Sequence, residues 1–291
     1  MSEDSSSTWS AKSSLVFGLK RQRTVLKKLM TKGPLYMQKL FYPEGINAQG
    51  LLPAHGYLLH PPGGLVSGDK LETNILLEEN AQLLLTTPAA QKVYRARDLV
   101  HKQIQNVRIF LKSGASLEYL PQENIIFSGA RAKLSLSVFL RQDSRLIAWD
   151  ILSLGRPEAD EFFDKGTLSQ SLKIIKDGRL IFLERLNVSE SMESLRSSLG
   201  YNSFPCYGLF MAVGREDDDA LKLARDELRE HLSIGKEKEC FAGITLKNGV
   251  LLGRALGYDM ELVRSILTNI WKILRPRLLN REATIPRIWN T

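Results

Sequence analysis

Short segments with a two-residue period dominate the pattern of apolar and polar positions. In 134–140, leucine or valine stands at every second position, with polar or aromatic side chains between them. This alternation is typical of a β-strand with one buried face, because successive side chains of a strand point to opposite sides. Segments 74–77 and 82–87 have strand-like composition and flank the turn-like residues 78–80. The pattern therefore predicts a chain built largely from strands.

Two dipeptides predict β-hairpins, namely Asp177-Gly178 and Asn248-Gly249. Each suits the two-residue turn that joins antiparallel strands, because both turn positions need backbone angles that Asn, Asp and Gly tolerate. The flanking apolar segments are 168–176 and 179–184 for the first turn, and 241–247 and 250–254 for the second.

Helical periodicity is confined to the C-terminal half. Segment 218–232 has leucine and alanine along one face and charges opposite, which is typical of an amphipathic helix. Asp259 is placed to cap a second helix that runs to about Leu274, and Pro276 is expected to end or kink it. A shorter helix is expected near Ser189.

These elements predict a mainly β fold with two or three α-helices in the C-terminal half. Residues 1–13 are rich in serine and poor in apolar groups, which predicts a disordered N-terminal tail. Residues 14–291 are expected to form a single β-rich domain with C-terminal helices and a basic tail. No internal sequence repeat is apparent.

The net charge of +8 is concentrated near the two ends of the chain. Residues 1–33 contain seven basic and two acidic residues, and residues 272–291 contain five basic and one acidic, so the remainder is close to neutral. A nucleic-acid-binding module that uses these basic termini is one interpretation. The neutral body and the absence of a base-stacking aromatic motif count against it.

Other compositional features favour a cytoplasmic protein. The two cysteines, Cys206 and Cys240, are far apart and form no Cys-x-x-Cys pair, which fits a reducing compartment. No apolar run is long enough for a signal peptide or a membrane span. No Gly-x-Ser-x-Gly or His-Glu-x-x-His motif occurs, so a hydrolase that uses His60 and Asp69 is only a weak alternative.

The segment from His60 to Asp69, with the sequence HPPGGLVSGD, must be a shaped loop. Its two prolines remove backbone donors, and its three glycines permit backbone angles that other residues avoid. The glycine spacing fits neither a dinucleotide loop nor a triphosphate loop. A tight surface turn is the alternative that the residues alone favour.

The loop nevertheless resembles the signature of the urease accessory proteins called UreD, or UreH in some species. Further blocks are similar to that family and follow in its order. They are TTPAAQKVYR at 86–95, EYLPQE at 118–123, FSGARA at 127–132, LGRP at 154–157 and PRIWNT at 286–291. Together they cover about residues 36–291.

The resemblance implies a stacked, helicoidal β-sheet arrangement and a role in urease maturation. It implies a non-catalytic scaffold that binds UreF and the urease structural subunits, and UreG through UreF. It implies transient nickel, with no tightly bound cofactor. GTP hydrolysis would belong to UreG, which agrees with the lack of a phosphate loop in this chain.

Five residues are candidates to line a passage for the nickel ion. Carboxylate and imidazole groups serve nickel, and a protein that passes metal onward should avoid a complete cage. The candidates are His60, Asp69, Glu123, Asp150 and Glu184. The four acids also have an ordinary structural interpretation: Asp69 as a turn residue, and the other three as ion-paired residues, for instance with Arg131, Arg156 or Arg185.

The C-terminal segment mixes charge with apolar anchors, a combination that interfaces favour. We expect it to help dock a partner protein. The candidate partner-binding residues are Arg275, Arg277, Arg281, Arg287 and Trp289.

Overall fold

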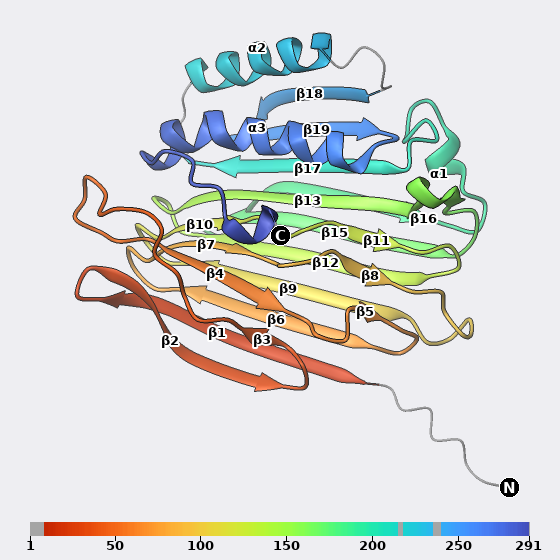
Figure 1. The fold of residues 1–291 in the computed structure, drawn as a ribbon, viewed down its shortest axis with the longest axis horizontal. Coiled ribbons are helices and arrows are strands. Elements are labelled where there is room, and N and C mark those ends of the chain that lie inside the picture. Colours follow the sequence, from red (N-terminus) through yellow and green to blue (C-terminus); the bar gives the residue numbers. More distant parts are fainter. Residues whose placement is uncertain (1–8, 215–217, 235–239, 291) are drawn as a thin grey trace, which may run out of the picture.

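Two β-sheets packed face to face form the body of the protein (Figure 1). The structure is a computed structural model that describes residues 9–214, 218–234 and 240–290. Within these ranges one sheet has seven strands and the other twelve. The strands of the seven-stranded sheet are β1 (Ser10–Lys20), β2 (Arg23–Lys32), β6 (Lys70–Leu77), β9 (Gln103–Leu111), β12 (Arg131–Leu140), β15 (Thr167–Lys176) and β16 (Arg179–Val188).

The larger sheet mixes long and very short strands. They are β3 (Tyr36–Met37), β4 (Ala54–Leu59), β5 (Gly64–Leu65), β7 (Gln82–Thr86), β8 (Gln91–Val93), β10 (Ser116–Tyr119), β11 (Asn124–Ile126), β13 (Arg145–Arg156), β14 (Glu161–Phe162), β17 (Cys206–Val213), β18 (Cys240–Lys247) and β19 (Val250–Gly257). The long strands follow the order β18-β19-β17-β13-β10-β7-β4.

Between β6 and β13 the chain winds in successive coils. It passes from β6 in one sheet to β7 and β8 in the other, then through β9, β10 and β11, and then from β12 to β13. Each strand pairs in parallel with the equivalent strand of the next coil, as β6 with β9 and β9 with β12. This winding confirms the expected helicoidal arrangement of stacked strands.

The coils place equivalent side chains in layers between the sheets. Leu77, Leu111 and Leu140 occupy one register position of β6, β9 and β12, and all three are buried. Burial of a leucine side chain contributes roughly 1.5–3 kcal/mol, so such layers supply much of the stability. Polar side chains interrupt the apolar layers at some positions; for instance, Gln105 pairs with Leu134, which pairs in turn with Gln170.

The two long helices pack on the outer face of the larger sheet, and the short one packs against strand β16 of the seven-stranded sheet (Figure 1). Their bounds are α1 (Glu193–Arg196), α2 (Asp218–Ile234) and α3 (Met260–Leu279), with 3₁₀ turns at Pro157–Ala159 and Arg287–Asn290. Asp259 caps α3 as expected, because its carboxylate accepts hydrogen bonds from the N–H groups of Glu261 and Leu262 at 2.8 and 3.1 Å. Among the described residues, no helix has the length and apolarity needed to cross a bilayer.

Both predicted hairpins are present as β15–β16 and β18–β19. Three local expectations need correction. The expected disordered tail extended to residue 13, but β1 already begins at Ser10 and pairs with β6, while residues 1–8 lie outside the described ranges. Pro276 does not end α3 at once, because the helix continues to Leu279. The helix expected near Ser189 begins later, at Glu193.

Candidate functional site

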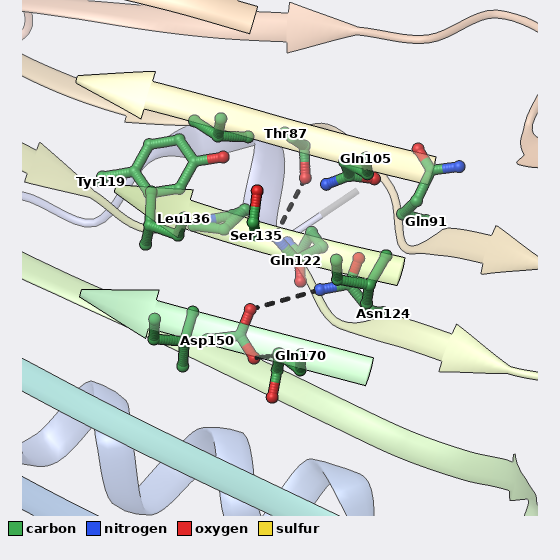
Figure 2. Close-up of a pocket in the computed structure, with 14 residues that line it drawn as sticks. Thr87, Gln91, Gln105, Tyr119, Gln122, Asn124, Ser135, Leu136, Asp150 and Gln170 are labelled. Carbon is green, nitrogen blue, oxygen red and sulfur yellow. Dashed lines mark hydrogen bonds between the residues drawn. The ribbon is translucent and has the colours of Figure 1, made fainter. Parts of the chain in front are cut away.

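Two adjoining cavities lie between the sheets, and we call the two together the passage; Figure 2 shows the residues that line one of them. Their volumes are about 70 Å³ and about 120 Å³. They are immediate neighbours, because five residues line both of them. These shared residues are Thr87, Gln91, Gln105, Val107 and Tyr119. Both sheets contribute to the walls, so the coiled winding of the chain creates the passage.

Asp150 of β13 is the one acidic side chain among the residues that line these two cavities. Gln170 donates a hydrogen bond to its Oδ2 atom at 2.6 Å, and the amide of Asn124 lies 3.5 Å from Oδ1 (Figure 2). Burial is the main cause that raises the pKa of Asp150 to about 6; the hydrogen bond from Gln170 opposes the rise, and the charge of Glu184 contributes to it. A carboxylate held among neutral amides lacks a cation and would gain from one.

Gln105 presents an unsatisfied oxygen in the passage. Its Oε1 atom is buried and accepts no hydrogen bond from the described residues. Leaving a buried acceptor unpaired costs roughly 1–3 kcal/mol, so a water molecule or a cation in the passage would stabilise it. Gln105 was not among our candidates. The sequence signal that could have identified Gln105 is its position in β9, two residues before Val107 and therefore on the same inward face.

His60 lines the cavity of about 120 Å³, whereas Asp150 lines the cavity of about 70 Å³. Its ring packs against Trp9 at 5.6 Å between centroids, and its two nitrogens are buried and make no hydrogen bond of ordinary geometry within the described chain. Burial lowers its pKa, although Gln91 and Asp69 oppose that effect. The ring is therefore held as neutral imidazole, the form that binds metal ions.

Asp69 is not among the residues that line the passage. Its Oδ2 atom accepts a hydrogen bond from the N–H of Val66 at 2.8 Å, and its own N–H donates to the Val66 carbonyl at 3.1 Å. Burial raises its pKa, and the Val66 hydrogen bond and the nearby His60 and Arg97 oppose the rise. Its geometry fits the turn interpretation that we left open, in which Asp69 holds the loop in shape.

Glu123 and Glu184 are paired with arginines and do not line the two cavities. Glu123 lies 3.5 Å from Arg264, and Glu184 contacts Arg254 and accepts a hydrogen bond from the Tyr207 hydroxyl. The ion-pair interpretation fits both acids, with different arginines from those we named. Of the five candidates, His60 and Asp150 thus line the two adjoining cavities, one residue in each.

The C-terminal candidates divide into buried and exposed residues. Arg275 is fully buried and Arg281 is 7% exposed, because both pair with Glu118 inside the protein. The expectation that these two dock a partner is therefore corrected: their guanidinium groups are engaged within the chain. Arg277 and Arg287 are exposed and stay candidates for a partner contact.

Trp289 is half-buried and packs within the protein. Its ring lies 5.3 Å from that of Trp149 and 5.6 Å from that of Trp271, and its indole N–H donates to Thr86 Oγ1 at 2.9 Å. This side chain therefore fixes the end of the chain on the larger sheet (Figure 1). Within the described ranges, no group of three or more His, Cys, Asp and Glu side chains is arranged to hold a metal ion.

Comparison with known proteins places similarity along almost the whole chain. The family model described as UreD urease accessory protein matches residues 10–290. The urease accessory protein UreD of Hahella chejuensis is 37% identical over 288 residues, which cover 97% of this chain and 91% of that protein. The protein of the same name from Vibrio parahaemolyticus is 39% identical over 287 residues, covering 99% and 98% of the two chains.

Proposed function

Because the chain belongs to the UreD family of urease accessory proteins, we propose that it takes part in urease maturation by guiding nickel through the passage between its two sheets. Membership of this family supports a role in urease maturation and implies a non-catalytic one. In the proposed role the protein holds UreF and the urease subunits together, with UreG joining through UreF. Nickel is then cargo and not a resident cofactor.

The observation that carries the proposal is the passage itself. Protein interiors are close-packed, so two adjoining cavities whose walls combine apolar side chains with several amides and one carboxylate need an explanation. Asp150 and the unpaired oxygen of Gln105 both lie on its walls. Both groups offer oxygen atoms that attract a positive charge in the passage. The neighbouring amides are neutral, so they do not repel water or a metal ion.

The donor set suits transit better than storage. One carboxylate with neutral amide oxygens attracts a divalent cation without enclosing it, so the ion can leave. The imidazole of His60 is a stronger nickel ligand, and it belongs to the adjoining cavity. Affinity alone does not select nickel over copper or zinc, so an enclosed route that keeps the ion away from stronger binders serves delivery better than a strong site would.

The test is the substitution Asp150→Asn in cells that express urease and its accessory proteins. We expect nickel per urease active site to fall at least fivefold, because the passage loses its only carboxylate, while co-purification with the partners is retained. Glu123→Gln is the matched control, since it neutralises an acid outside the two cavities. Full nickel loading with Asp150→Asn would refute the passage.

A further inference from the structure

The outer face of the seven-stranded sheet bears one continuous row of apolar side chains. The strand registers align Val16, Leu76, Phe110, Phe139, Ile175 and Leu180 across β1, β6, β9, β12, β15 and β16. Phe110 is 39% exposed and Leu180 55% exposed, and the other four are half-buried. The parallel rings of Phe110 and Phe139 stack at 4.6 Å between centroids. We call these six residues the outer apolar row.

Basic side chains are frequent among the remaining outward positions of this sheet, alongside serine and asparagine. Six cations without a carboxylate partner among the described residues occupy them: Lys28, Lys32, Arg108, Lys133, Lys173 and Arg185. Two further lysines, Lys12 and Lys70, share Glu72, which is the single acid on these rows. The lysines of β1 and β2 therefore belong to a folded face, where the sequence had suggested a basic terminus.

We propose that the outer apolar row receives an amphipathic helix of a partner protein, with an apolar stripe and acidic flanks. The row crosses six strands, which at about 4.8 Å per strand spans roughly 24 Å. A helix of about 16 residues has the same length, at 1.5 Å per residue. Its stripe would cover the row, and its acids would meet Arg108 and Lys173 in the adjacent register.

Charge argues against a second copy of this chain as the occupant. Two such faces brought together would set unpaired lysines and arginines against each other, which is costly. Single-stranded nucleic acid suits the charge but not the row. Bases need free aromatic faces, whereas Phe110 and Phe139 are stacked on each other and their neighbours in the row are aliphatic.

The row lies on the opposite side of the seven-stranded sheet from the passage. Residues such as Val107 and Leu134 point inward to the cavities, and Phe110 and Phe139 point outward. A partner on this face would therefore leave the passage lining intact. The proposed nickel passage and the proposed docking face can therefore be refuted independently of each other.

The probe is a fluorescent 18-residue peptide with leucines along one helical stripe and glutamate elsewhere, titrated against the full chain by anisotropy. Two companion peptides have the same leucine stripe with lysine for glutamate, or the same composition in scrambled order. We expect the glutamate stripe peptide to bind at least tenfold more tightly than either. Equal binding of the three peptides would overturn the proposal.

Two variants locate the binding. Arg108→Glu with Lys173→Glu removes the charge match, and Phe110→Ser with Phe139→Ser removes the centre of the row; each should weaken binding at least tenfold. Phe241→Ser is the matched control, because Phe241 is 62% exposed on β18, away from this face, and should change binding less than twofold. An oligonucleotide that binds more tightly than the glutamate stripe peptide and depends on Phe110 and Phe139 would contradict the proposal, as would unchanged binding in both double variants.

Discussion

The guanidinium group of Arg275 lies against the carboxylate of Glu118 in the interior, with 2.7 Å between Nε and Oε2 and no exposure of either side chain. Trp271 donates its indole N–H to the same oxygen at 2.7 Å, and Arg281 lies 3.3 Å from Oε1. Arg275 also contacts Glu44 at 2.5 Å. This network joins α3, β10 and the segment before β4, so it fixes the helical layer to the larger sheet.

Replacing Arg275 with methionine should destabilise the protein by about 3–5 kcal/mol, because Glu118 and Glu44 would stay buried with only the more distant guanidinium group of Arg281 as an arginine partner. The expected readout is a large fall in the urea midpoint of unfolding. Arg277→Met is the control on the same helix, since Arg277 is exposed, and should shift stability by no more than about 0.5 kcal/mol. Similar midpoints for the two variants would contradict the proposed anchoring role of the network.

Asp150 should make the folded protein less stable as pH rises. Its pKa of about 6 in the folded state lies above the ordinary value of 3.8. The contribution of the Asp150 carboxyl to stability is therefore complete below about pH 4 and is lost as the pH rises through about 6. In Asp150→Asn that loss disappears. The stability of the variant relative to the native chain should therefore rise by on the order of 3 kcal/mol between pH 4 and pH 7.

Urea unfolding at several pH values measures this difference directly. A difference that stays constant from pH 4 to pH 7 would show that Asp150 is ionised without cost. The result bears on the nickel experiment as well, because a variant that is more stable at neutral pH cannot lose nickel delivery through unfolding.

Trp289→Ala should lower stability by about 2 kcal/mol, since it removes a half-buried indole from contact with Trp149 and Trp271. The near-ultraviolet circular dichroism should change as well, because the three indoles lie close together. A native unfolding midpoint and spectrum would show that the end of the chain does not pack on the sheet in solution. Arg287→Ala, an exposed neighbour, is the control.

Local signals in the sequence predicted local structure well. Asp177-Gly178 and Asn248-Gly249 form the turns of the two hairpins, and Asp259 caps α3. The winding of the strands could not be predicted from residue pattern. Segments 74–77 and 82–87 are strands, as expected, but they belong to different sheets. A two-residue period indicates which face is buried and does not identify the partner strand.

The candidate site was predicted only in part, again because a residue pattern does not identify contacts between residues that are distant in sequence. The acids within apolar segments were visible in the sequence, yet only Asp150 of the four lines the passage, because arginines distant in sequence neutralise Glu123 and Glu184. Gln105 and Gln170 were missed, although each occupies an inward phase of its strand. A polar residue in phase with buried neighbours is the signal that could have identified them.

The central claim is tested most directly by blocking the passage without changing its charge. Val107→Phe fills a wall shared by the two cavities, and Val138→Phe overpacks the same sheet at a buried position outside them. Both should cost about 1–3 kcal/mol of stability. The measurement is nickel per urease active site after maturation in cells that contain either variant. We predict at least a fivefold fall for Val107→Phe alone; equal nickel contents in the two would contradict a route through the interior.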